Sequence, residues 1–205
     1  MTTTMTTTMR KFLLLNIIFL ATLFSSQITF AHAYHYEVQV TNALQTNEKN
    51  QLEALKLTFL YDGETSEVML QDQKDLEKLG KKLVSDLGKL SYFTQAKVNG
   101  KFLDFKEVSD IKLDTIKEEG YDKKLYDILQ LHFTLVLKTP VNIDGDSEIG
   151  FIHEDASNAA ILYYENKKHI LLGDNLKDRC KTSIKEKGKF DEGEFPQIVS
   201  VSCKS

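Results

Sequence analysis

The sequence predicts an α+β domain that is mainly antiparallel β, sandwich-like in its arrangement, with one amphipathic helix. Two observations lead to this prediction. Short stretches of alternating apolar and polar residues recur along most of the 205-residue chain, as expected for strands with one buried face. Only one segment, around residues 72–90, repeats leucines at helical spacing. Seven or more short strands with a single helix fit a layered α+β domain.

The first residues have the layout of a secretory signal peptide. Arg10 and Lys11 are followed by an apolar run over residues 12–24 and then by a short polar break. The run is shorter than the roughly 20 residues that span a bilayer as a helix, although a retained membrane anchor is the alternative. We expect residues 1–31 to be the signal peptide, with an alternative cut after Ala33. Residues 32–205 are then expected to form a single periplasmic domain.

The first two strands are predicted from strict alternation. Residues 36–41 alternate between an apolar and a polar face, and the polar run 45–51 turns the chain. Residues 55–61 alternate again, and Asp62-Gly63 is expected to end that strand. The short connection predicts that the two strands form a hairpin.

The helix is predicted to begin at Asp72, whose side chain can cap it, with Asp75 close to the positive end of the helix dipole. Gly88 lies where a C-terminal stop is expected. The apolar stripe consists of Leu76, Leu79, Leu83, Leu87 and Leu90.

Asn99-Gly100 is the strongest hairpin signal, because it supplies the positive φ angles of a type I′ turn between residues 93–98 and 101–105. Residues 129–137 alternate most clearly, and Pro140 is expected just beyond that strand. Further strands are predicted at residues 108–116, 148–153, 160–164, 169–172, 180–185 and 198–203.

Cys180 and Cys203 are the only cysteines in the sequence. In an exported protein such a pair predicts a disulfide, which would join the last strand to the preceding one. A metal site is the alternative, but the spacing fits no zinc motif.

Composition and motifs argue against several classes of protein. The chain has 26 basic and 30 acidic residues, and removal of the leader makes the balance more acidic, so nucleic-acid binding is not expected. The sequence contains no nucleophile elbow or glycine-rich phosphate loop, and the cysteines are expected to be oxidised. We therefore expect no enzymatic activity. Glu118-Glu119 is interpreted as part of an acidic cluster in a turn among lysines.

The histidines are the candidate ligands for zinc, copper or nickel. A site is predicted from His35 with His153, Glu154 and Asp155, on the condition that their strands are neighbours; separate surface histidines are the alternative. If cleavage leaves His32 first, its amine and ring could chelate copper together with His35. Of the two further histidines, His132 is interpreted as structural and His169 as exposed.

Three segments carry a resemblance to a known family: Ser91-Tyr92-Phe93-Thr94, Val98-Asn99-Gly100-Lys101 and residues 131–140. They resemble domain-of-unknown-function family 1007, whose members are exported bacterial proteins, and the resemblance runs from about His35 to Cys180. Members are described as periplasmic components of transport systems that accompany permeases linked to zinc, nickel or cobalt. The resemblance therefore implies a periplasmic accessory protein with an inner-membrane metal permease as partner. Together with the histidines, it leads us to expect that the protein binds zinc, nickel or cobalt transiently.

Two departures weaken the metal role that the resemblance implies. Family members usually begin the mature chain with His-Pro-His, where this chain has Ala33-Tyr34-His35. The family's Tyr-Asp-Pro segment has its nearest match in residues 153–155. The alternative function is an envelope interaction module that binds a membrane partner and no metal, and an oxidative copper enzyme is a third.

Overall fold

The computed structural model describes residues 35–119, 123–157, 159–186 and 196–204, and the structural statements below concern these residues. They belong to one compact unit, His35–Ser205. Most are in strands and few are in helices, which confirms the α+β class. The predicted signal peptide lies outside the described residues. Within them, no helix is long and apolar enough to cross a membrane.

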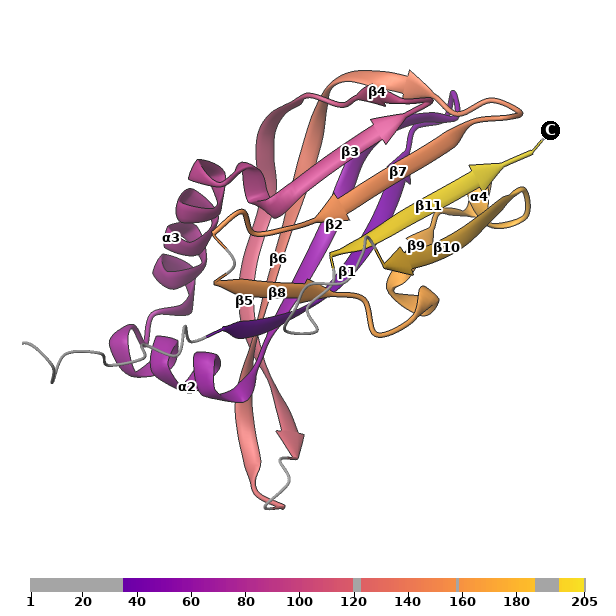
Figure 1. The fold of residues 1–205 in the computed structure, drawn as a ribbon. Coiled ribbons are helices and arrows are strands. Elements are labelled where there is room, and N and C mark those ends of the chain that lie inside the picture. The colour runs from indigo at the N-terminus through magenta and orange to yellow at the C-terminus, as the bar shows by residue number, and fades with distance from the viewer. Residues whose placement is uncertain (1–34, 120–122, 158, 187–195, 205) are drawn as a thin grey trace, which may run out of the picture. The chain divides into compact units, whose positions relative to one another are not determined.

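The larger sheet, sheet A, contains six strands in the order β5-β6-β2-β1-β8, with β9 also paired to β1 (Figure 1). The first four of these strands pair antiparallel with their neighbours, and the β1–β2 pair confirms the predicted hairpin. In contrast, β8 and β9 both run parallel to β1. The strands are β1 (Tyr36–Thr46), β2 (Gln51–Tyr61), β5 (Phe105–Glu119), β6 (Leu125–Asn142), β8 (Ala160–Tyr163) and β9 (Ile170–Leu172).

The smaller sheet, sheet B, contains five strands in the order β10-β11-β7-β3-β4. The predicted turn between β3 and β4 is confirmed, because Asn99 and Gly100 have φ angles of 50° and 77°. The predicted disulfide is also confirmed: Cys180 lies opposite Cys203 in the β10–β11 ladder and is bonded to it. The strands are β3 (Thr94–Val98), β4 (Lys101–Phe102), β7 (Glu148–His153), β10 (Cys180–Glu186) and β11 (Gln197–Cys203).

Side chains from both sheets belong to one hydrophobic cluster. Phe59 of β2 and Phe133 of β6 meet edge to face, with ring centroids 5.2 Å apart. Phe151 of β7 and Val199 of β11 join the same cluster from sheet B. Each large apolar side chain removed from water contributes about 1.5–3 kcal/mol, so this cluster is the main source of stability.

Two helices follow β2 where one was predicted: α2 (Gly63–Asp72) and α3 (Leu76–Lys89). The predicted start at Asp72 was wrong, because Asp72 is the last residue of α2. Asp75 caps α3 instead, accepting a hydrogen bond of 3.1 Å from the N–H of Lys78. Hydrophobic periodicity could not reveal α2, since the only side chains it buries are those of Thr65 and Ser66. A shorter helix, α4 (Asp174–Lys177), precedes β10.

Asp62 lies between β2 and α2 and caps the start of the helix. Its Oδ1 accepts a hydrogen bond of 2.7 Å from the N–H of Thr65, and its Oδ2 accepts one of 2.8 Å from the N–H of Glu37 in β1. Farther along α2, Ser66 Oγ accepts a hydrogen bond of 3.0 Å from the N–H of Leu129 in β6. These bonds hold α2 against the start of β1 and against β6.

β5 and β6 continue past β2 as a two-stranded arm. Residues 115–119 pair with residues 125–129, whereas β2 pairs with β6 only from Gln130 onward. The arm projects at the bottom of Figure 1, next to α2. It makes both strands longer than the alternating segments that predicted them.

Pro140 lies inside β6, not beyond it as predicted. The register between β2 and β6 shifts here: Ala54 pairs with Val136, but Leu52 pairs with Val141. The stretch that contains Pro140 is thus skipped by the ladder, so its missing N–H removes no hydrogen bond to β2.

Replacing Gly80 or Gly88 of α3 by alanine should change the free energy of unfolding in different ways. A Cβ at Gly80 would lie 3.0 Å from the Cβ of Leu113 in β5, whereas one at Gly88 would lie 3.2 Å from the Tyr92 hydroxyl, at the end of a movable side chain. We expect Gly80→Ala to lower the free energy of unfolding by about 1–3 kcal/mol through overpacking, despite better helix propensity. Gly88→Ala should be neutral or stabilising. Urea unfolding measures both, and equal stabilisation would contradict the close approach of α3 to β5.

Candidate functional site

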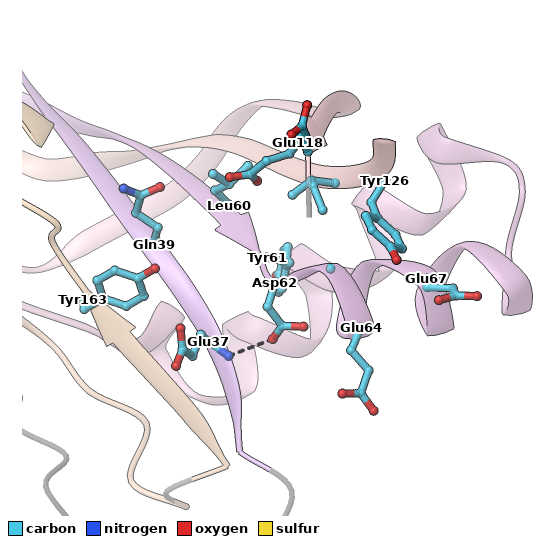
Figure 2. Close-up of a pocket in the computed structure, with 13 residues that line it drawn as sticks. Glu37, Gln39, Leu60, Tyr61, Asp62, Glu64, Glu67, Glu118, Tyr126 and Tyr163 are labelled. Carbon is cyan, nitrogen blue, oxygen red and sulfur yellow. Dashed lines mark hydrogen bonds between the residues drawn. The ribbon is translucent and has the colours of Figure 1, made fainter. Parts of the chain in front are cut away.

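An open pocket of about 890 Å³ lies where α2, the arm and the outer face of sheet A meet (Figure 2). Leu60 of β2 and Ile128 of β6 supply apolar surface, and the rings of Tyr126 and Tyr163 come from the arm and from β8. The strand register explains this assembly, because Gln39 of β1 is paired with both Leu60 and Tyr163.

The pocket is strongly acidic. Its lining includes no lysine, arginine or histidine among the described residues, and it includes six carboxylates: Glu37, Asp62, Glu64, Glu67, Glu118 and Glu119. Figure 2 shows that Glu118 approaches from the arm, while Glu64 and Glu67 lie along α2. Because like charges gather in one concavity, the pocket favours a positively charged occupant.

The pKa of Tyr163 reflects the negative charge of the pocket. Burial raises the pKa of its hydroxyl, and the charges of Glu37, Glu165, Glu118 and Asp62 raise it further. Three of those four acidic residues line the pocket. The carboxylates of β1, β5 and the start of α2 therefore act on one point, although they are far apart in the sequence.

The sequence prediction missed this site because it assigned Glu118-Glu119 to a turn. Both residues lie in β5, and Glu118 is paired with Tyr126 across the arm. The neighbouring Lys117 forms an ion pair with Asp127, 2.8 Å away. Acidic residues at the start of β1, the start of α2 and the end of β5 were visible in the sequence, but only the topology shows that they converge.

A row of polar side chains crosses the outer face of sheet A beside the pocket. Nδ1 of His132 lies 2.9 Å from Oγ1 of Thr58, and Nδ1 of His169 lies 2.9 Å from Oγ1 of Thr41. The two threonines are opposite each other in β1 and β2. The bonded position of His132 agrees with its interpretation as structural. His169 was expected to be exposed, but its side chain is only 24% exposed because it lies between Thr41 and Glu165.

His153, a predicted metal ligand, lies in the core. β7 buries Ile149, Phe151 and His153 on one face, and His153 is 2% exposed. Burial disfavours the charged imidazolium and lowers the pKa of His153 to about 3. Its ring therefore faces other aromatic rings and not solvent.

Asp155, another predicted ligand, holds the loop that leads into β8. Its carboxylate accepts hydrogen bonds from the N–H and hydroxyl of Ser157, 2.8 and 2.7 Å long, and from the N–H groups of Ala159 and Ala160. Burial raises the pKa of Asp155, but the hydrogen bonds from Ser157, Ala160 and Ala159 outweigh it, so the pKa lies below its usual value. The carboxylate oxygens are thus already engaged within their own loop.

The remaining predicted ligands do not complete a site with these two. The backbone N–H of Glu154 donates a hydrogen bond of 2.8 Å to the carbonyl of Phe93, and His35 lies half-buried just before β1. His32 lies outside the described residues. In the part of the chain that the structure describes, no three His, Cys, Asp or Glu residues are placed to hold a metal ion. The physical reason is topological: β1 belongs to sheet A and β7 to sheet B, so strand pairing does not bring His35 beside His153.

The fold and the pocket together define an α+β domain of two β-sheets whose candidate site is suited to cationic groups. The chain belongs to the family described as Protein of unknown function (DUF1007), which matches residues 17–192. The family resemblance predicted from the sequence is thereby confirmed. No curated protein matches the chain at a significant level.

Proposed function

We propose that this chain is an exported, non-enzymatic accessory protein of a zinc, nickel or cobalt transport system, and that it acts by contacting an inner-membrane metal permease. The transport context rests on the resemblance described under the sequence analysis. The intramolecular disulfide supports an oxidising compartment such as the periplasm. The observation that carries the mode of action is the acidic pocket beside α2.

The occupant that best matches this pocket is a basic segment of the partner, with lysine or arginine next to an apolar residue. The carboxylates of Glu37, Glu118 and Glu119 would pair with the cations, and the faces of Tyr126 and Tyr163 would accept cation–π contacts. The apolar surface of Leu60 and Ile128 would cover the neighbouring apolar side chain. Such complementarity speeds association and selects the partner.

A role in holding the ion itself draws less support. Zinc, nickel and cobalt favour nitrogen and sulfur ligands, whereas carboxylate oxygens suit magnesium, calcium or manganese. The pocket offers carboxylates, and the predicted His35–His153 set is not assembled among the described residues. We therefore favour the contact role over transient ion binding.

The scaffold for this contact is, in our proposal, a sandwich-like domain. Ring contacts that join the sheets support it: Phe59 of sheet A lies 6.3 Å from His153 of sheet B, and Phe151 lies 6.2 Å from Tyr164, which follows β8. Facing apolar sides would leave the outer face of sheet A free to present the pocket.

The proposal predicts that neutralising the pocket abolishes function without unfolding the protein. Cells that lack the protein should take up less zinc, nickel or cobalt, and the wild-type chain should restore uptake. Glu37→Gln/Glu118→Gln/Glu119→Gln should fail to restore it, because exposed carboxylates are removed from the pocket alone. The matched control, Glu77→Gln/Asp86→Asn on the exposed face of α3, should restore uptake.

Three outcomes would contradict parts of this proposal. Unchanged uptake of all three ions without the protein would reject the transport role. Full rescue by the triple pocket variant would reject the pocket as the contact site. Calorimetric binding of one of the ions at micromolar concentration, lost in His35→Ala, would replace the contact role by an ion-holding role.

A further inference from the structure

Four polar side chains are buried together at the end of β7, away from the acidic pocket. They are His153 of β7, Thr94 of β3, Asn42 of β1 and Tyr164, which follows β8. All four are at most 5% exposed. The ring of His153 lies 5.6 Å from that of Tyr164 and 5.9 Å from that of Phe151. Strands of both sheets thus contribute polar groups to one point in the core.

An unusual turn before β3 determines which nitrogen of His153 carries its hydrogen. Ser91, Tyr92 and Phe93 have φ angles of 53°, 56° and 52°, a left-handed conformation that non-glycine residues rarely adopt. In this turn the carbonyl of Tyr92 accepts a hydrogen bond of 2.8 Å from the hydroxyl of Thr94. A hydroxyl has one hydrogen, so Oγ1 of Thr94 must act as the acceptor for Nδ1 of His153, 3.0 Å away.

Nε2 of His153 is therefore a lone-pair acceptor that points into the core. It has no hydrogen-bond partner among the described residues, and the same holds for both amide atoms of Asn42 and for the hydroxyl of Tyr164. The side chain of Asn42 lies near the Tyr164 hydroxyl: burial raises the pKa of Tyr164 well above its usual value, and a hydrogen-bonding interaction with Asn42 lowers it. The two groups do not, however, reach the distance and angles of a regular hydrogen bond. Buried polar atoms without a partner are rare in folded proteins.

We propose that these three side chains bind one internal water molecule. The water would donate one hydrogen bond to Nε2 of His153, accept one from the hydroxyl of Tyr164, and make a third to the amide of Asn42. Three polar partners from different strands are typical of a structural water. This site is independent of the proposed function.

The chemistry of the three ligands favours water over a metal ion. None of them is a carboxylate or thiolate, so a divalent cation would be buried with uncompensated charge. Direct bonds from the Asn42 amide to Nε2 and from the Tyr164 hydroxyl to the Asn42 oxygen would also satisfy these atoms, but none of them has a partner at hydrogen-bond geometry among the described residues. A water bound between the three groups would satisfy them together.

A high-resolution crystal structure of the mature protein, with data collected also at the zinc, nickel and cobalt absorption edges, tests this inference. We expect one density peak about 2.7–3.2 Å from Nε2, without anomalous signal, and its loss in His153→Phe. Nitrogen NMR of the wild-type protein should show the hydrogen on Nδ1, a readout that needs no variant. An anomalous peak, a direct Asn42–His153 bond with no density between the three side chains, or a hydrogen on Nε2 would each overturn the proposal.

Discussion

The free energy of unfolding should fall steadily as the pH is lowered from about 6.5 toward 3, because His153 is buried in its neutral form. Its pKa is about 3 in the folded protein, against 6.5 for an ordinary histidine. Between these values the unfolded chain binds a proton that the folded protein does not. Lowering the pH therefore favours unfolding, by at most about 1.4 kcal/mol per pH unit.

In the upper part of this pH range, His153 affects the free energy of unfolding and the carboxylate of Asp155 does not. The pKa of Asp155 lies below 3.8 in the folded protein, so the stability that this group contributes is present above that pH and is lost only as the pH falls further. Urea unfolding between pH 7.5 and 4.5 should thus show the slope of His153. Replacing His153 by Phe, which keeps an aromatic ring among Phe59, Phe151 and Tyr164, should reduce it.

Phe151→Leu is the matched control for this experiment. Phe151 is 1% exposed and packs against His153, but it does not titrate. The variant should lower the free energy of unfolding at every pH and keep the slope of the wild-type protein. If His153→Phe kept that slope as well, the histidine would not be the group that takes up the proton.

Reduction of the Cys180–Cys203 disulfide should lower the free energy of unfolding by about 3 kcal/mol. The two cysteines are 23 positions apart in the sequence, and the bond between them restricts that loop in the unfolded chain. The effect should be visible because β10 is an edge strand that pairs with β11 alone in sheet B. Unfolding with and without a reductant measures it. Cys180→Ala/Cys203→Ala should have the stability of the reduced protein and should not respond to the reductant.

Thiol labelling decides whether that comparison is valid. If labelling shows two free thiols after reduction and the unfolding transition has not moved, the disulfide does not stabilise this fold. Reduction should leave the far side of sheet B intact, because β3 and β7 are held by their own ladder and by the Asn99–Glu148 hydrogen bond of 2.8 Å.

Short sequence patterns predicted those turns and strands whose structure is determined by a single stretch of the chain. Asn99-Gly100 specified its turn because only a few residues tolerate positive φ at both positions. The alternation of residues 129–137 predicted the centre of β6, although it gave no warning of the arm, whose outer residues such as Leu125 and Ile116 are exposed. The sequence predicted the class of the fold and the neighbours joined by short turns or by the disulfide, but not the pairing of strands that are distant in the chain.

The candidate site could not be predicted from the sequence for the same reason. Its carboxylates come from β1, α2 and β5, and α2 itself carries no apolar stripe. One signal was available: Asp62 followed by Glu64 is a common helix start. A different signal bears on the predicted metal ligand: Ile149, Phe151 and His153 alternate along the chain, and this places His153 on the buried face of β7.

The position of β1 in sheet A constrains the order in which the protein can form. β1 is the first described strand, yet it pairs with β8 and β9, which come late in the chain, as the pairing of Tyr36 with Ala160 shows. Such distant pairing is slow, because a long loop must close before it is rewarded. Sheet A therefore cannot be completed until the chain is present as far as Leu172, the end of β9. The topology thus delays completion of sheet A until almost the whole described chain is present, and the Cys180–Cys203 bond, which closes nearer the C-terminus, can form only after that.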